Sequence, residues 1–396
     1  MRNALFIPLV LLLLLTACRK AQITATVNGT GTPGWTDSSL QHPKNPAFTN
    51  LLEKYRQKGL PGISLLVMDS HGTWTGETGF ADIENKRPFH TTTVSKVASI
   101  TKLFMGALVF RLIEDSMHTG MGYSNLDQKI SHWLPERVIR HLPNGDKITL
   151  GQCMKHETGI PDVISQDNFY LAVLNNPNHI WTQEELLGYI YDMPAEFNAG
   201  DTAVYSNTNT ILITMVMEAQ TGTQHADLLK KYITQPLGLT STFYQPHETL
   251  PNTVAQGYFD LYNNSTIVNV SNLVTGSGNG YGGIYSNLFD LYKFADALLI
   301  RQTLLSPQSM TKMLQFGKRD DTNYYGYGIQ KSFLDQGNNW GIGHKGRDLG
   351  YTANLFYFPA KGVLHIFFIN YGTDADSGLK QVFREFQDEL VALSLQ

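Results

Sequence analysis

A serine and a lysine three residues apart give the first indication of chemistry in this chain. Ser99 and Lys102 belong to the segment Ser99-Ile100-Thr101-Lys102, at the start of an apolar pattern with helical spacing. Residues i and i+3 share one face of a helix, so the lysine nitrogen can reach the serine hydroxyl. The positive end of the helix dipole favours a developing oxyanion and disfavours a charged lysine. A neutral lysine could then take the serine proton, which activates such a nucleophile.

The short motifs recur along the chain, so spacing alone does not locate the site. A second S-x-x-K begins at Ser309, and roughly one such match is expected by chance in a chain of this composition. Two candidate partner motifs also occur more than once: Tyr-Ser-Asn begins at Tyr123, Tyr205 and Tyr285, and H-x-G begins at His118 and His344. The order of the motifs and the elements that carry them must decide between the copies.

Several other reactive signatures are missing from the sequence. It contains no G-x-S-x-G, no H-E-x-x-H and no G-x-x-x-x-G-K-[ST], which disfavours an α/β-hydrolase, a zinc protease and a P-loop enzyme. The 12 histidines show no metal-ligand spacing, so neither a metal nor another cofactor is expected. With 30 Lys+Arg and 34 Asp+Glu, the formal charge of −4 provides no strong positive field for nucleic acid.

The elements that must position these residues follow from the hydrophobic patterns. At 42% hydrophobic and 16% charged residues, the chain has an ordinary globular composition with an ample core. Strand patterns lie at both ends of the chain, over 63–68, 73–80, 325–331, 340–344, 351–358 and 363–370. Helical spacing covers 48–58, 99–120, 208–219, 288–299 and 377–393. We expect an α/β fold of the α+β type. Its antiparallel sheet is built from both chain ends with flanking helices, and a large, mostly helical region is inserted between them.

The first residues form a separate segment. Arg2 precedes the apolar run 4–16, which is shorter than the roughly 20 residues that span a bilayer and is typical of a signal peptide. The run ends in Leu15-Thr16-Ala17-Cys18, which resembles the lipobox of bacterial lipoproteins, where cleavage precedes a lipid-carrying cysteine. The alternative is an ordinary secretory signal with an incidental cysteine.

The lipobox divides the chain into a signal peptide (1–17), a lipid-anchored flexible tether (18–44) and a folded domain (45–396). Polar residues with Gly, Thr and Pro and no periodicity fill the tether. We therefore expect an exported bacterial lipoprotein, held at a membrane by its N-terminal lipid and facing the periplasm or the cell exterior. Lipidation of Cys18 leaves only Cys153, so no intrachain disulfide can form and Cys153 is expected to be a small buried residue.

Further segments place the serine motif in an ordered series. VSKVASITK (94–102) is followed by ITL (148–150), HETGIP (156–161), GDTAVYSN (200–207), PLGLT (236–240) and GGIYS (282–286). In this order they resemble the serine β-lactamase and penicillin-binding protein family, especially class C β-lactamases, DD-carboxypeptidases and related esterases. The resemblance runs from about Phe48 to the C-terminus. It implies a β-lactamase/transpeptidase-like fold and a serine hydrolase.

The resemblance assigns roles around the nucleophile. It implies that Ser99 is acylated and that Lys102 and Tyr205 act as general base and acid, with the residue that takes the first proton left open. Asn207 would hydrogen-bond the substrate amide and Lys102. The backbone N–H groups of Ser99 and Arg347 would form the oxyanion hole.

The last motif departs from the family pattern. His344-Lys345-Gly346 stands where class C β-lactamases have Lys-Thr-Gly, so the histidine argues against that class. His344 is the candidate catalytic histidine, and Gly346 and Arg347 belong to the strand that would line the substrate. Lys345 replaces a hydroxyl residue that commonly helps to bind a substrate carboxylate, although alternation along a strand could turn it away from the cleft. Arg347 could bind a carboxylate through two hydrogen bonds or narrow the site.

The order of the motifs also assigns the remaining copies to structural positions. Ser309 follows the tyrosine motif and is expected on a surface helix, and Tyr123 falls in the loop after the nucleophile helix. Tyr285 is expected to open a later helix. His118 lies at the far end of the helix that Ser99 begins.

Three functions remain open at this point. The first is an acyl-enzyme hydrolase of a peptide or lactam amide, such as a DD-carboxypeptidase acting on a peptidoglycan stem peptide or a β-lactam. The second is an esterase that uses the same residues on the same scaffold. The third is a surface lipoprotein that binds without hydrolysis, which the intact Ser99, Lys102 and Tyr205 disfavour. Similarity of fold does not choose between the substrates.

Overall fold

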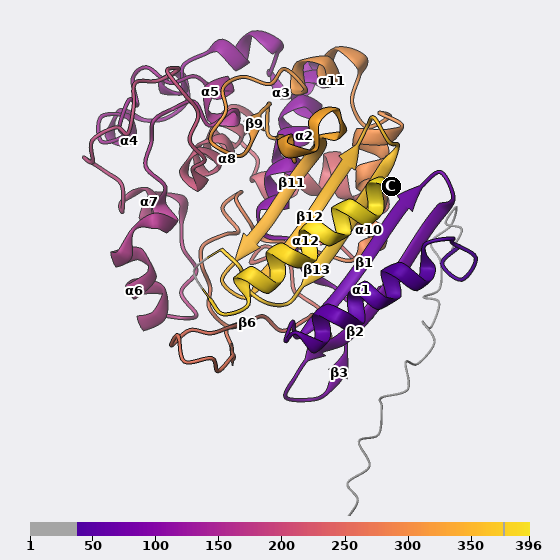
Figure 1. Ribbon diagram of the computed structural model, residues 1–396. Helices are drawn as coiled ribbons and strands as arrows, with labels where there is room; N and C mark the ends of the chain where they lie inside the picture. The colour runs from indigo at the N-terminus through magenta and orange to yellow at the C-terminus, as the bar shows by residue number, and fades with distance from the viewer. Residues whose placement is uncertain (1–37, 375–376) are drawn as a thin grey trace, which may run out of the picture.

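A computed structural model describes residues 38–374 and 377–396 of the chain. Its centre is an eight-stranded antiparallel sheet with the strand order β3-β2-β1-β13-β12-β11-β10-β9 (Figure 1). The N-terminal strands are β1 (Gly62–Asp69), β2 (Gly72–Asp82) and β3 (Arg87–Pro88). The C-terminal strands are β9 (Tyr324–Tyr325), β10 (Gln330–Ser332), β11 (Gly341–Asp348), β12 (Tyr351–Phe358) and β13 (Val363–Ile369). The two ends of the chain meet where β1 pairs with β13, which confirms the predicted sheet.

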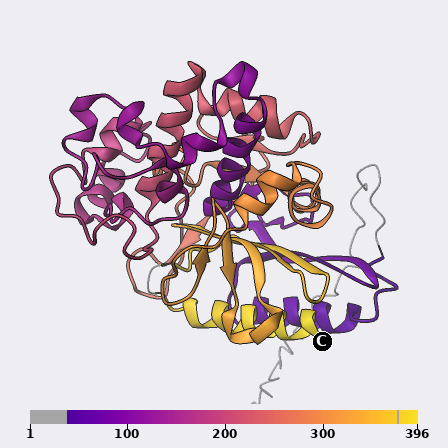
Figure 2. The ribbon, with the colours of Figure 1, turned by 90° about the horizontal axis from the view of Figure 1, so that it is seen from above.

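Two helices from opposite ends of the chain cover one face of the sheet. They are α1 (Asn45–Gln57) and α12 (Lys380–Leu395), which lie side by side beneath the strands in Figure 2. Tyr55 of α1 packs edge-on against Phe386 of α12, with ring centroids 5.4 Å apart. Along β1, Leu65 and Val67 face these helices, whereas Leu66 faces the other core, as the alternation of a strand requires.

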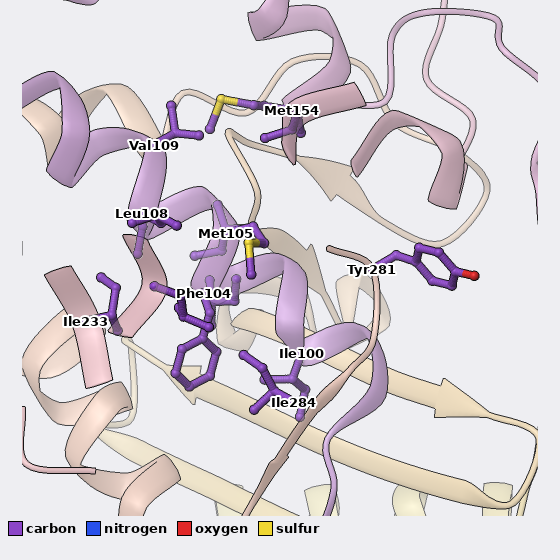
Figure 3. Packing of buried hydrophobic residues seen from close by; sticks show 14 of the residues in the cluster. Ile100, Phe104, Met105, Leu108, Val109, Met154, Ile233, Tyr281 and Ile284 are labelled. Atoms are coloured by element: carbon purple, nitrogen blue, oxygen red, sulfur yellow. The ribbon is translucent and has the colours of Figure 1, made fainter. Parts of the chain in front are cut away.

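The inserted region packs on the opposite face around α2 (Thr101–Glu114). Its other helices are α3 (Ser116–Thr119), α4 (Glu136–Ile139), α5 (Leu150–Met154), α6 (Asp167–Asn175), α7 (Gln183–Leu187), α8 (Asn207–Thr221), α9 (His225–Leu229), α10 (Leu288–Ala295) and α11 (Pro307–Met313). α2 is apolar on nearly every side because it is enclosed (Figure 3). Phe104 of α2 stacks on Phe294 of α10 with ring centroids 3.6 Å apart.

Two details of the expected elements differ in the structure. The predicted strand 325–331 is interrupted between β9 and β10, where Gly328 has a φ of +77° and touches Gly106 of α2 so closely that neither position has room for a Cβ. A small second sheet joins β4 (Ser95–Lys96), β8 (Ile284–Ser286) and β5 (Phe243–Tyr244). Tyr285 therefore lies in a strand instead of opening a helix.

The folded body begins earlier than the expected boundary at residue 45. Ser38 and Ser39 accept hydrogen bonds from the backbone N–H groups of Thr73 and Thr75 at 2.9 and 2.8 Å. The two serine hydroxyls thus satisfy N–H groups on the outer side of β2, so residues 38–44 belong to the domain and not to a tether. Cys18 and the predicted signal peptide lie outside the described residues. Within residues 38–374 and 377–396, no helix combines the length and apolar character needed to cross a membrane.

Candidate active site

The nucleophile segment lies between the two sheets and α2. Ser99 occupies a 3₁₀ turn (Ala98–Ile100) directly before α2, following Ala98, which has a φ of +49°. A positive φ costs a residue with a Cβ some backbone strain, and such strain is often kept where a reactive side chain must be aimed. β11 crosses this turn so closely that a Cβ on Gly346 would collide with the backbone oxygen of Val97. Gly346 therefore allows the strand to lie against the nucleophile turn.

Lys102 is buried directly beneath Ser99. Its Nζ donates to Ser99 Oγ at 3.1 Å, to Asn207 Oδ1 at 2.6 Å and to the backbone oxygen of Tyr281 at 2.8 Å. Burial lowers the pKa of Lys102 to about 7, although the negative charge of Asp162 acts in the opposite direction. A substantial fraction of this amine is therefore unprotonated at neutral pH and able to accept the serine proton.

Tyr205 lies on the other side of the same hydroxyl. Its phenol is hydrogen-bonded to the Ser99 side chain, and Lys102 Nζ lies 4.9 Å from its ring centroid. Burial holds the pKa of Tyr205 well above its usual value, so the phenol keeps its proton and is a donor. The structure thus brings together Ser99, Lys102, Tyr205 and Asn207, which the sequence analysis selected.

A buried histidine that the sequence analysis left without a role holds the tyrosine in place. His156 O accepts from the N–H of Val204, and His156 Nδ1 accepts from the N–H of Ser206, at 3.1 and 3.2 Å. The imidazole also packs on the Tyr205 ring with centroids 4.6 Å apart. Both backbone neighbours of Tyr205 are therefore fixed by one residue. The only sequence signal for this contact was the HETGIP segment itself.

Asp162, which directly follows this segment, was also missed. Its carboxylate accepts from the backbone N–H and the side-chain amide of Asn207 at 3.0 and 2.8 Å. Burial raises the pKa of Asp162 to about 6, and Lys102 lowers it. Composition and spacing gave no sign of this contact, because 45 residues separate Asp162 from Asn207.

Other predicted site residues lie elsewhere. His344 is buried against Tyr205, with ring centroids 6.1 Å apart, and does not line the cavity at Ser99. Its Nδ1 bonds the backbone oxygen of Lys345 at 2.6 Å, and burial together with Lys102 holds its pKa well below the usual value. His344 is therefore a neutral residue that packs against the Tyr205 ring.

Protein groups engage the Arg347 side chain. Its guanidinium donates to the backbone oxygens of Gly346 and Ala353 at 2.7 Å and to Asn354 Oδ1 at 2.9 Å, and it stacks over Phe383 of α12 at 4.6 Å. These contacts hold the charge on the α12 side of the sheet, although Arg347 is also one of the residues that line the cavity at Ser99. The contacts disfavour the alternative in which this guanidinium binds a substrate carboxylate, because protein acceptors already engage the group.

The other copies of the short motifs, at Ser309, Tyr123 and His118, make contacts that stabilise the fold. Ser309 is buried, not on the surface as expected, and its hydroxyl lies 2.7 Å from the phenol oxygen of Tyr123. His118 is paired with Asp115 at 2.6 Å at the end of the α2–α3 segment. Cys153 is buried in the core, which raises its pKa to about 12 and keeps its thiol protonated.

A cavity of about 550 Å³ opens at Ser99. Its reactive end is formed by Ser99, Asp162, Tyr205 and Asn207. Apolar side chains form much of the remainder: Ile164, Tyr170, Leu174, Phe259, Leu261 and Leu349. Charged residues also line it: Asp320, Lys345, Arg347, Asp348 and Asp374. Such a mixture suits a substrate with one apolar and one polar part.

Lys345 is a further cation among the residues that line this cavity. On β11 it alternates with His344 and Gly346, which face Tyr205 and the turn at Ser99, and it shares its side of the strand with Arg347. Burial and the charge of Arg347 lower the pKa of Lys345, whereas Asp320 and Asp374, which line the same cavity, act in the opposite direction. Asp348 is paired with Lys96 at 2.7 Å. A partly buried ammonium favours an anionic ligand.

One cluster outside the cavity has the residue types of a metal site. Donor atoms of His42, Asp69 and His71 lie within 4.8 Å of one another. However, the N–H of Lys44 donates to His42 Nδ1 at 3.2 Å, so Nε2 carries the hydrogen and donates to Asp69 at 3.1 Å. A metal on Nε2 would require a hydrogen on Nδ1, where the Lys44 N–H already points. Hydrogen bonding therefore explains this cluster without a metal.

Most of the described domain is similar to known proteins. A sequence profile of the Beta-lactamase family matches residues 48–385. Penicillin-binding protein 4* of Bacillus subtilis is 26% identical over 235 residues, which cover 56% of this chain and 48% of that protein. Unguisins hydrolase ungD' of Aspergillus campestris is 28% identical over 63% of this chain and 46% of its own length. The chain thus spans about half the length of these curated relatives or less.

Solved structures show the same fold. A D-stereospecific amidohydrolase from Streptomyces sp. superimposes with a TM-score of 0.74 and 26% identity, covering 86% of this chain and 98% of that one. D-amino acid amidase from Ochrobactrum anthropi, complexed with L-phenylalanine amide, gives a TM-score of 0.75 at 23% identity, over 88% of this chain and 97% of that chain. At that identity the amidase shows similarity of fold alone.

Proposed function

Because this chain belongs to the Beta-lactamase family, whose members are serine hydrolases, we propose that it cleaves the amide bond of a small peptide or lactam through an acyl-enzyme on Ser99. The observation that carries the proposal is the 3.1 Å contact between Ser99 Oγ and the Nζ of a buried lysine, at the end of a cavity. DD-carboxypeptidase-like cleavage is the form we favour.

The two proton-transfer residues take different roles in this mechanism. Lys102, with a pKa of about 7, accepts the Ser99 proton while Oγ bonds to the substrate carbonyl carbon. Tyr205, whose pKa is raised, donates its proton to the departing amine and regains one from Lys102. Water then attacks the acyl-enzyme in the reverse sense, which releases the acid product and restores Ser99.

Lys345 supports a substrate with a free carboxylate. Lys345 is one of the residues that line the cavity at Ser99, and its positive charge would attract a C-terminal or lactam carboxylate. The apolar residues of the cavity would hold the substrate's side chain, and the remaining hydrogen of the Asn207 amide is available to a substrate carbonyl.

The esterase alternative rests on the apolar part of the same cavity. Ile164, Tyr170 and Leu174 offer no charged partner to a substrate, so an uncharged ester with an apolar group could also occupy them. Acylation of Ser99 would follow the same proton transfers, since only the leaving group differs.

Intact-mass measurement after exposure to a labelled penicillin and to a fluorophosphonate tests the proposal. We expect one fluorophosphonate adduct on the wild type and on Ser309→Ala, and none on Ser99→Ala. A penicillin adduct that Lys345→Ala weakens would support the carboxylate-bearing substrate. Faster turnover of a p-nitrophenyl ester than of a D-Ala-D-Ala peptide, with no penicillin adduct, would favour the esterase. If neither reagent labels Ser99, the proposed function is wrong.

A further inference from the structure

Asp162 is linked to Lys102 through the side chain of Asn207. Its Oδ1 accepts from the backbone N–H of Asn207 at 3.0 Å and from that of Ile164 at 3.3 Å. Its Oδ2 accepts from Asn207 Nδ2 at 2.8 Å. The opposite end of the same amide, Asn207 Oδ1, accepts from Lys102 Nζ at 2.6 Å.

The carboxylate fixes the direction in which the Asn207 amide points. A primary amide has an oxygen that only accepts and a nitrogen that only donates, whereas an ionised carboxylate only accepts. The nitrogen of Asn207 must therefore face Asp162, and its oxygen must face Lys102. In the reversed orientation, the amide would meet the carboxylate with its oxygen and the lysine with N–H groups.

The backbone contacts of Asp162 alone would make it a structural cap. Its Oδ1 caps the 3₁₀ turn at Val163–Ser165, a position where a short polar side chain is expected for local reasons. The Oδ2 contact to Asn207 Nδ2 does nothing for that turn. This contact instead links Asp162, through the Asn207 amide, to Lys102.

We propose that Asp162 is a positioning residue for the Ser99–Lys102 pair and acts through the side-chain amide of Asn207. The inference rests on the proposed function, because it assumes that Lys102 must accept the Ser99 proton. Asp162 does not reach the substrate carbonyl in this scheme, since both of its oxygens already accept hydrogen bonds from the protein.

The negative charge of Asp162 has a second effect on Lys102. It stabilises the ammonium and thereby raises the pKa of Lys102 against the larger effect of burial. Other groups that act on or face this lysine are Asp348, Asp374, Tyr205, Tyr281, His156 and His344. Among these, the two aspartates act in the same direction as Asp162, and the histidines are neutral. Removing the charge of Asp162 therefore lowers the pKa of Lys102.

Asp162→Asn separates the cap from the positioning role. The new amide oxygen can still accept from the backbone N–H groups of Ile164 and Asn207, so the 3₁₀ turn keeps its cap. The new amide nitrogen, however, faces Asn207 Nδ2, and two donors cannot bond. The rate of fluorophosphonate labelling of Ser99, followed by intact mass from pH 5 to pH 10, reports on the catalytic pair directly.

We expect two changes in this variant. At pH 9, where Lys102 is neutral in both proteins, labelling falls roughly ten- to a hundredfold, as expected for losing one hydrogen bond to a charged group. The acidic limb of the pH profile moves to lower pH, because the lysine loses its proton more readily. A purely structural role would change the melting temperature without moving this limb. Asp167→Asn, an exposed carboxylate at the start of α6, is the matched control and should change neither.

The exchanged double variant, Asp162→Asn with Asn207→Asp, gives a rescue test. The amide at 162 can donate to the carboxylate at 207, whose other oxygen can accept from Lys102. We expect it to recover labelling relative to Asp162→Asn. If the wild type is labelled and Asp162→Asn keeps its rate and pH limb, the positioning role is wrong, whether or not the double variant folds. If the wild type is not labelled at Ser99, the proposed function fails and this inference fails with it.

Discussion

At Lys102, the cost of burying an ammonium makes a base available near neutral pH. An exposed lysine is protonated until about pH 10.4. Here the low dielectric of the interior outweighs the nearby carboxylates and brings the pKa to about 7. The neighbouring tyrosine is affected in the opposite sense, since burial raises the pKa of Tyr205 and keeps its phenol protonated. One environment thus supplies both a base and an acid.

The pH dependence of catalysis follows from this base. Because Lys102 must be unprotonated to accept the Ser99 proton, kcat/KM should rise with pH and level off above the pKa of about 7. The measurement is kcat/KM on one substrate from pH 5 to pH 9, with a melting curve at each pH. A rate that is flat across pH 7 while the protein stays folded would contradict this role of the lysine.

Of the tyrosines in the Tyr-Ser-Asn tripeptides, only Tyr205 should matter for chemistry. Tyr205→Phe keeps the ring on His156 but removes the proton, so kcat/KM should fall about a hundred- to ten-thousandfold with little change in stability. Tyr285→Phe and Tyr123→Phe are the controls, because their rings pack in β8 and near Ser309. Equal loss of activity in Tyr285→Phe at an unchanged melting temperature would show that the assignment is wrong.

At the scale of elements, β11 can approach the turn at Ser99 because residue 346 is a glycine and has no side chain. Gly346→Ala places a methyl group against the backbone oxygen of Val97, so the strand or the turn must move. We expect a loss of stability of about 1–3 kcal/mol, typical of overpacking, together with slower labelling of Ser99. Chemical denaturation and fluorophosphonate labelling measure the two effects.

Gly378→Ala is the control for this substitution, because a Cβ there meets no atom within 4 Å among residues 38–374 and 377–396. It should change neither stability nor labelling. A Gly346→Ala protein with wild-type stability and labelling would mean that the approach of β11 to Val97 does not position Ser99.

At the scale of the whole molecule, both chain ends are committed to one sheet. β1 and β13 pair along six residues, from Ile63 with Ile369 to Met68 with Leu364, and α1 packs beside α12. Contacts between residues so distant in sequence are slow to form, because the chain entropy must be lost before the contacts are gained.

We propose that the segment before Ser38 carries the lipid anchor. If Cys18 is lipidated, Cys18→Ser should move the protein from the membrane fraction to the soluble fraction of cells. The melting temperature and Ser99 labelling should not change, because Cys18 precedes the described domain. A wild-type protein that is found soluble and cleaved at another position would contradict the proposal.

The sequence by itself determined the elements and much of the reactive centre. Helical spacing after Ser99 and strand patterns at both chain ends are local properties, and the i, i+3 relation of Ser99 and Lys102 is fixed by one helix turn. The ordered motifs were sufficient to select Tyr205 and Asn207 from their copies. The interruption between β9 and β10 was not predicted, because it depends on the contact of Gly328 with Gly106 of α2.

Only the tertiary structure decided which side chains face the cavity. Arg347 is one of the residues that line the cavity at Ser99, yet its guanidinium is engaged by the backbone oxygen of Ala353 and by Asn354 Oδ1. Asp162 and His156 reach Asn207 and Tyr205 from about 45–50 residues away. The pKa of Lys102 likewise depends on burial by several segments. Contacts between distant segments, and the desolvation that they cause, do not appear in the local hydrophobic pattern of the sequence. They could therefore be identified only from the tertiary structure.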